Sequence, residues 1–208
     1  METVLMRDIV ERVLEKIQKE RTIPVEASGR HVHLSRQHIG QLFGEHYQMT
    51  KKKDLSQPGQ FQCNERVTLI GPKGVLQGVA ILGPARDRTQ VEVSISDARV
   101  LGIAPPVRES GHLDGAGSIY IAAEKAVIEA RESVIISKRH IHMTPADAAR
   151  FDVKDRQIVS VRVKGERSIV FEDVVVRVND AYRLNMHIDF DEANAAGFCP
   201  GVVGEVIL

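Results

Sequence analysis

The spacing of hydrophobic positions along the chain changes near Pro24. From Val4 to Ile17, apolar residues recur at helical spacing and charged residues occupy the opposite face, which predicts an amphipathic helix over residues 1–21. Pro24 ends this pattern. The rest of the chain reads as short runs rich in Val and Ile, separated by turns that contain Gly and Pro. Such spacing favours small sheets or barrels.

Several of these runs are predicted strands, and short helices are expected between them. The strands are Val67–Ile70, Val75–Leu82, Gln90–Ile95, Ile158–Val163, Ile169–Val178 and Leu184–Ile188. The helices are expected to follow Ser35, Ser96, Thr144 and Asp191, because these side chains can accept hydrogen bonds from the amides of a first helical turn. Residues 119–130 fit either a strand or a helix.

The chain contains an internal repeat. The segment Val25–Ser35 matches Val134–Thr144, and both copies contain Ser-x-Arg-His-x-His. A fainter match aligns Glu92–Ala98 with His187–Ala193. The Pro- and Gly-rich segment 105–126 is the natural linker between the copies. We therefore predict two related β-rich units, residues 22–132 and 133–208.

Composition excludes several classes of function. The 28 basic residues balance the 28 acidic ones, so no net field attracts nucleic acid or an anionic membrane. Tryptophan is absent, which argues against a base-stacking platform. No run approaches the roughly 20 apolar residues of a membrane-spanning helix. The two cysteines match neither a disulfide framework nor a CxxC metal motif. We expect a cytoplasmic protein without nucleic-acid or membrane partners.

The repeated His-x-His pairs predict two metal sites. On a strand, residues i and i+2 point to the same face, so each pair can hold one ion. A lone pair of this kind is more often two surface or hydrogen-bonded histidines, but its duplication within a longer motif favours metal. Three protein ligands leave one coordination position open, as in catalytic zinc sites, although cobalt or nickel would also fit. The predicted ligand sets are His31, His33 and Glu92, and His140, His142 and His187.

Basic residues near the first set could bind an anion. Arg86 shortly precedes Glu92, and its planar guanidinium could bind phosphate. The alternative is a surface arginine in a turn. The run Lys51–Lys53 fits either contact with a nucleotide phosphate or a solvated strand edge.

These motifs resemble those of the PduL-type phosphotransacylases, also called phosphate propanoyltransferases. The resemblance covers nearly all of residues 23–208. It implies two β-barrels capped by short helices, an initial strand exchanged between the halves, and a homodimer or larger homo-oligomer. The segments that carry it are Ser28-Gly-Arg-His-Val-His33, Lys53–Phe61, Leu82-Gly-Pro-Ala-Arg86, Arg139-His-Ile-His-Met143 and Met186-His-Ile-Asp189.

The resemblance also implies roles for individual residues. Each predicted ligand set should hold one zinc ion, and the first ion can also bind the sulfur of coenzyme A. Arg86 matches the family's phosphate-binding arginine. Lys53 and Ser110 match positions near the coenzyme A nucleotide. Asp54 stands where proline is expected, which puts only a peripheral contact in doubt.

The implied reaction interconverts a short-chain acyl-CoA and phosphate with acyl phosphate and coenzyme A. One zinc ion with Arg86 would bind phosphate, and the other would stabilise the departing thiolate. Positioning and Lewis-acid stabilisation suffice without a covalent acyl-enzyme, so Cys63 and Cys199 are not assigned as nucleophiles. The acyl group, propionyl or acetyl, is left open. The alternatives are a zinc-dependent acyl-CoA thioesterase and a non-catalytic zinc-stabilised β-module.

Members of this family often serve bacterial microcompartments. The amphipathic segment 1–20 could be an encapsulation peptide that binds shell or cargo proteins, or it could pack on the protein's own body. Both readings stay open. The first places the cytoplasmic enzyme inside a microcompartment.

Overall fold

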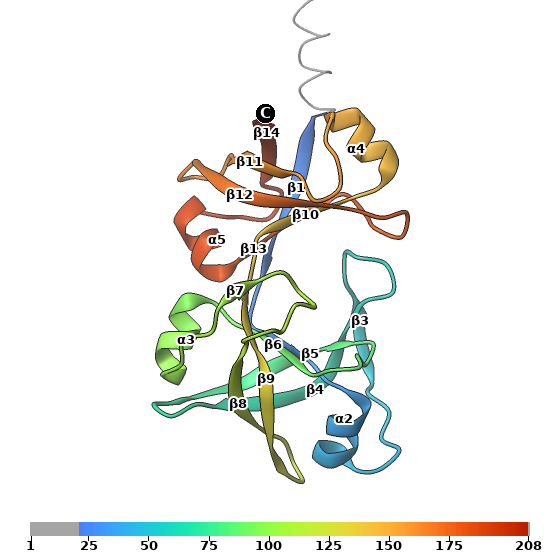
Figure 1. The fold of residues 1–208 in the computed structure, drawn as a ribbon, viewed down its shortest axis with the longest axis vertical. Helices are drawn as coiled ribbons and strands as arrows, with labels where there is room; N and C mark the ends of the chain where they lie inside the picture. Colours follow the sequence, from blue (N-terminus) through green and yellow to red (C-terminus); the bar gives the residue numbers. More distant parts are fainter. Residues whose placement is uncertain (1–20, 208) are drawn as a thin grey trace, which may run out of the picture. The chain divides into compact units, whose positions relative to one another are not determined.

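A computed structural model describes residues 21–207 (Figure 1). Two compact units form within it. The first unit contains Ala27–Arg139 and Ile188–Asn194, and the second contains the described chain up to Glu26, His140–His187 and the chain from Ala195 onward. The predicted N-terminal helix falls on residues 1–20, outside the described residues. Within the described range, no helix is both long and apolar enough to cross a membrane.

The first unit is built on a closed barrel. Its strands run in the order β4-β5-β2-β6-β9-β8, and β8 pairs with β4 to close the ring. Strand β3 extends the sheet beside β4, and β7 pairs with β9. The bounds are β2 His31–His33, β3 Lys51–Asp54, β4 Phe61–Ile70, β5 Val75–Gly83, β6 Gln90–Glu92, β7 Val107–Arg108, β8 Gly117–Ala122 and β9 Val127–Ser137.

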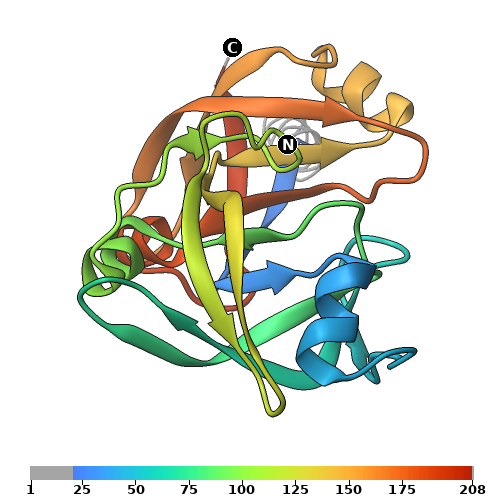
Figure 2. The same cartoon turned by 60° about the horizontal axis from the view of Figure 1, so that its bottom comes forward.

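The predicted linker 105–126 is wrong, because it contains two strands of this unit. Strand β8 alternates buried and exposed side chains, with Ile119 and Ile121 buried and Tyr120 exposed. This is the two-residue period of a half-buried strand. Figure 2 shows β8 and β9 as one long hairpin. The ambiguous run 119–130 is therefore strand on both sides of a turn.

The second unit contains another closed barrel, with the strand order β1-β13-β10-β12-β11-β14. The structure thus confirms a mainly β fold with two related barrels. Strand β1 precedes all strands of the first barrel in sequence, yet it pairs with β14 at the other end of the chain. The bounds are β1 Thr22–Ser28, β10 His140–Met143, β11 Ile158–Val163, β12 Ile169–Val178, β13 Asn185–Asp189 and β14 Val203–Ile207.

The end of β9 is the repeat counterpart of β1, and it pairs in the first barrel. Val134 lies opposite Val91 of β6, in parallel register. The matching residue, Val25, belongs to β1 in the second barrel. Val25 thus belongs to the second barrel and Val134 to the first. The exchange of an initial strand between the halves stays a prediction.

Four short helices lie among these strands: α2 Arg36–Phe43, α3 Ile95–Leu101, α4 Pro145–Phe151 and α5 Phe190–Ala196. Ser35 and Thr144 cap α2 and α4 as predicted.

The other two predicted caps, Ser96 and Asp191, are wrong by two residues. Ser94 caps α3 through a capping box with Asp97. At α5, the Asp189 carboxylate accepts from the Glu192 amide at 2.8 Å and Glu192 accepts from the Asp189 amide at 3.0 Å. Helix α5 therefore begins directly after β13, and α3 begins after only two further residues beyond β6, so each helix closely follows the strand that carries the third predicted ligand.

Alternation along the short strands decides which side chains enter the core. Val32 and Ile141 are fully buried in the middle of β2 and β10. Their neighbours on either side must then point to the opposite face of the sheet. Those neighbours are the histidines of the two His-x-His pairs.

Candidate functional site

The first three predicted ligands meet where β2 and β6 pair. The strands are antiparallel, and the register places His31 opposite Glu92. One ligand atom from each of His31, His33 and Glu92 lies within 4.8 Å of the others, and all three residues are buried. The two imidazole rings stand nearly perpendicular, with centroids 5.0 Å apart. We call this group the first clamp.

The local backbone orients His31. Its Nδ1 lies 2.8 Å from the Gly29 carbonyl oxygen, and a carbonyl only accepts, so Nδ1 carries the proton. The other nitrogen, Nε2, faces Oε2 of Glu92 at 3.6 Å. Between Gly29 and His31, the Arg30 guanidinium binds Asp97 through Nε at 2.9 Å and a terminal nitrogen at 2.8 Å. This pair ties the start of β2 to the first turn of α3.

The protonation of the first clamp favours a bound cation. Burial alone would raise the pKa of Glu92, but the charge and hydrogen bond of His31, with smaller effects of His33 and Arg86, hold it well below its usual value. Burial lowers the pKa of His33 well below its usual value, and the positive charges of His31 and Arg86 lower it further. At neutral pH the site therefore holds a carboxylate beside an unprotonated imidazole.

His31 has the opposite balance. Burial lowers its pKa, but the Glu92 carboxylate attracts the proton more strongly, and the net pKa is raised. A metal ion on Nε2 would replace this proton as the cation beside Glu92.

Arg86 reaches the first clamp from the segment that follows β5. Its amide donates to the Leu34 carbonyl at 3.0 Å, which fixes the backbone beside the end of β2. One guanidinium nitrogen donates to Nε2 of His33 at 2.9 Å, and the other donates to the Ser110 hydroxyl at 3.2 Å. An arginine can only donate, so His33 Nε2 presents its lone pair here.

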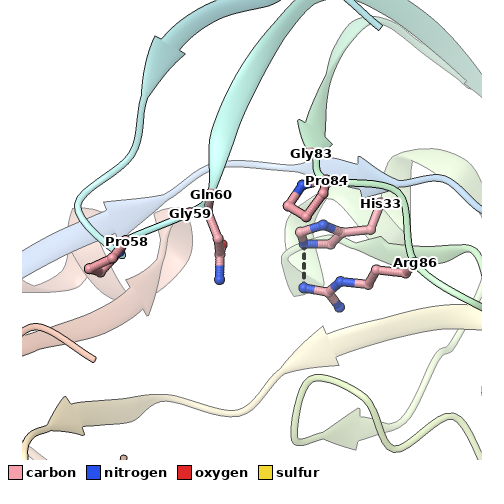
Figure 3. A pocket seen from close by; sticks show the side chains of 7 residues that line it. All are labelled: His33, Pro58, Gly59, Gln60, Gly83, Pro84 and Arg86. Carbon is pink, nitrogen blue, oxygen red and sulfur yellow. Dashed lines mark hydrogen bonds between the residues drawn. The ribbon is translucent and has the colours of Figure 1, made fainter. Parts of the chain in front are cut away.

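A cavity of about 350 Å³ opens beside His33 and Arg86. Figure 3 shows these two side chains, with their hydrogen bond, facing Gln60 across the cavity. Its remaining lining consists of small or apolar residues, Pro58, Gly59, Gly83 and Pro84. The cavity thus offers a cationic group and an unprotonated imidazole at a largely apolar wall.

The other three predicted ligands meet at the pairing of β10 and β13. The register places His140 opposite His187, and one ligand atom of each histidine lies within 4.8 Å of the others. The ring centroids of His142 lie 4.7 Å from His140 and 5.0 Å from His187. We call this group the second clamp.

The second clamp leaves a buried nitrogen lone pair or proton unsatisfied. Within residues 21–207, Nδ1 of His142 is buried and has no hydrogen-bond partner. Burial, followed by the charges of His140, His187 and Arg177, lowers the pKa of His142 to about 2. A buried polar atom without a partner is costly, and a neutral imidazole nitrogen is a natural zinc ligand. Both clamps therefore fit a zinc ion by donor type and spacing.

Comparison with known proteins agrees with the motifs. The family model described as phosphate propanoyltransferase matches residues 24–199. A phosphate propanoyltransferase of Clostridioides difficile is 51% identical over 203 residues, which cover 98% of this chain and 97% of the relative. The corresponding protein of Enterococcus faecalis is 53% identical, with 97% of each chain covered. That of Thermotoga maritima is 49% identical over 90% of each chain.

The chain belongs to the phosphate propanoyltransferase family. The predicted resemblance is thus confirmed. Membership assigns the chain to the acyltransferases.

The structure brings most of the predicted site residues together. Arg86 and Ser110 lie at the first clamp, where Ser110 donates to Oε1 of Glu92 at 3.1 Å. Lys53 is exposed on β3 and is not among the residues that line the cavity. The predicted roles of Lys53 and Ser110 in binding coenzyme A stay predictions.

Two amide residues beside the clamps were missed by the sequence reasoning. Gln90 lies opposite His33 and Asn185 lies opposite His142, each buried and two residues before the third ligand. The period of a strand and the fainter repeat together contain this signal, because Gln90-x-Glu92 aligns with Asn185-x-His187.

The pKa of His142 predicts acid sensitivity of the metal-free protein. Its folded pKa of about 2 lies below its ordinary value of 6.5, so the unfolded chain binds more protons between these values and stability falls as pH falls below about 6.5. Between about pH 7.5 and about pH 5.5, the preference of the unfolded chain for protonated His142 should lower the free energy of unfolding by about 1 kcal/mol. Urea midpoints of chelator-treated protein should therefore fall more for the wild type than for His142→Asn.

The exposed His112 provides the control. His112→Asn should behave as the wild type does. Equal acid sensitivity of the wild type and His142→Asn would show that His142 is not held neutral in the folded protein.

Proposed function

We propose that the chain transfers a short acyl group between coenzyme A and inorganic phosphate, with propionyl or acetyl as the group. Arg86 is the observation that carries the proposal. Its guanidinium contacts a histidine of the first clamp and lines a cavity of about 350 Å³. A planar cation beside a candidate metal site suits an oxyanion with several acceptor oxygens, as phosphate has.

His31, His33 and Glu92 would hold a zinc ion in this proposal. Bound zinc supplies a Lewis acid that stabilises negative charge on oxygen or sulfur. His31 is oriented for this by the Gly29 carbonyl, and Glu92 supplies negative charge next to it. His33 would contribute Nε2, the nitrogen that now accepts a hydrogen bond from Arg86.

Arg86 would change partners when the clamp is loaded. Once His33 Nε2 is a ligand, it no longer accepts from the guanidinium, and Arg86 can donate to an anion in the adjoining cavity. The hydrogen bond to the Ser110 hydroxyl would keep the guanidinium plane oriented. In this arrangement Arg86 binds phosphate and directs one phosphate oxygen toward the thioester.

The exchange balances without a covalent intermediate. A phosphate oxygen forms a bond to the acyl carbon, the carbon–sulfur bond breaks, and the proton of hydrogen phosphate ends on the coenzyme A sulfur. Burial, aided by the negative charge of Glu65, raises the pKa of the Cys63 thiol to about 11, so this thiol stays protonated near neutral pH. Its burial and protonation argue against a route through an acylated Cys63.

A second zinc ion is proposed for the second clamp. Three imidazoles are a common catalytic zinc ligand set, and the buried Nδ1 of His142 would gain a partner. Cobalt or nickel would also be accepted by these nitrogens. Zinc is proposed because its tetrahedral preference matches three protein ligands and one open position.

The reaction is tested by following products from propionyl-CoA with and without phosphate. We expect acyl phosphate and free thiol in equal amounts, and only when phosphate is present. Thioester loss that does not depend on phosphate would instead support the zinc-dependent thioesterase. No turnover under either condition, with zinc bound, would support the non-catalytic module.

Arg86→Ala should raise the apparent KM for phosphate. Loss of one charge-assisted contact is worth about 1.5–3 kcal/mol, or roughly 10- to 100-fold in kcat/KM for phosphate. Arg88→Ala is the matched control, because Arg88 is exposed two residues later and contacts Glu132. If both variants keep the wild-type dependence on phosphate, Arg86 is not the phosphate-binding group.

We also propose that residues 1–20 target the enzyme to a microcompartment. The amphipathic pattern of this segment supports the proposal. A fluorescent protein fused to residues 1–20 should co-sediment with assembled shells, and a fusion carrying the same residues in scrambled order should not. Equal behaviour of the two fusions would contradict targeting. The predicted homodimer or larger assembly stays a prediction.

A further inference from the structure

Gln90 is a buried amide beside the first clamp. It lies on β6 two residues before Glu92, on the same face, and opposite His33 in the neighbouring strand. Only 1% of its surface is exposed. A glutamine this deeply buried must have its amide group satisfied, or it would destabilise the fold.

Every polar end of Gln90 has a partner. Its Nε2 donates to Oε1 of Glu92 at 2.6 Å and to the Ser110 hydroxyl at 2.8 Å. Its Oε1 accepts from the Gly111 amide at 2.8 Å. These bonds fix which end of the amide is the donor, because the Gly111 amide cannot accept.

The consequence for Glu92 is a carboxylate with two different oxygens. Oε1 accepts from both Gln90 and Ser110, whose hydroxyl lies at 3.1 Å. Oε2 faces Nε2 of His31 at 3.6 Å. With the lone pairs of Oε1 engaged, only Oε2 is presented to an ion between Glu92 and the histidines.

We propose that Gln90 is a positioning residue that makes Glu92 a single-oxygen metal ligand. The inference rests on the metal assignment of the proposed function and adds to it. Single-oxygen binding leaves a coordination position open, whereas a carboxylate that turns to offer both oxygens would fill it. Ser110 extends the arrangement, because its hydroxyl contacts Gln90, Glu92 and Arg86 at once.

The second clamp has no counterpart of the hydrogen bond between Gln90 and Glu92. Asn185 occupies the matching place opposite His142, but the third ligand there is His187, which has no second oxygen to restrain. Within the described residues, Oδ1 of Asn185 is buried without a hydrogen-bond partner. The amide–carboxylate bond is thus a property of the first clamp, and its loss should affect that clamp alone.

The test is zinc binding to metal-free protein, measured by competition with a chromophoric chelator. Gln90→Met keeps the bulk of the side chain without hydrogen bonds. Gln90→Leu removes the hydrogen bonds with a branched apolar side chain instead. Both should bind zinc about 10- to 100-fold more weakly at one site and normally at the other, as expected for loss of a group that orients a ligand.

A spectroscopic readout separates positioning from general damage. With cobalt in place of zinc, the visible absorption of one site should change in both Gln90 variants, because its coordination number changes when Glu92 can offer both oxygens. Gln57→Met is the matched control, since Gln57 is also buried in the first unit but lies outside the clamp. It should leave affinity and spectrum unchanged.

The outcomes separate this inference from the proposed function. Two zinc ions per wild-type chain, with full affinity and an unchanged cobalt spectrum in the Gln90 variants, would overturn the inference and leave the function standing. Wild-type protein that binds no zinc at the first clamp would overturn both. If a Gln90 variant does not fold, Ser110→Ala serves instead, because it removes the other donor to Oε1, and undiminished affinity there contradicts the inference.

Discussion

The pairing of two very short strands is the constraint on which the rest of the site depends. Strand β2 has three residues, and its middle residue, Val32, is fully buried in the barrel core. Because side chains alternate along a strand, burial of Val32 sends His31 and His33 together to the other face. The antiparallel register with β6 then sets Glu92 opposite His31. A shift of one residue would move the histidines into the core.

In the second unit, a buried central residue and an antiparallel register place the ligands in the same way, but the third ligand is a histidine. Ile141 is fully buried between its histidines, and the register with β13 sets His187 opposite His140. One clamp therefore carries a carboxylate and the other only imidazoles. Burial of Glu92 and of several histidines is expensive unless an opposite charge compensates it. In the first clamp the positive charges of His31 and Arg86 compensate the negative charge of Glu92, and a metal ion would take over part of that role.

Much of this arrangement could be predicted from the sequence. The spacing within each His-x-His motif indicates a strand, and the recurrence of the motif indicates a duplication. The third ligands, Glu92 and His187, followed from the fainter repeat. The helix starts were misplaced by two residues because Ser96 and Asp191 are capping residue types as good as Ser94 and Asp189. Only the end of the preceding strand, which is a tertiary property, decides between them.

Other features could not be obtained from local patterns. Segment 105–126 has the composition of a linker, yet β8 closes the first barrel by pairing with β4, which lies far away in sequence. The bonds of Gln90 and Ser110 to Glu92 likewise join residues whose proximity depends on the completed sheet.

We propose that each clamp holds one metal ion. Anomalous X-ray diffraction from crystals of the zinc-loaded protein, recorded on both sides of the zinc edge, tests this most directly. We expect one zinc peak bound by His31, His33 and Glu92 and another bound by His140, His142 and His187, at ligand distances of about 2.0–2.2 Å. Zinc peaks elsewhere, with neither clamp occupied, would contradict it.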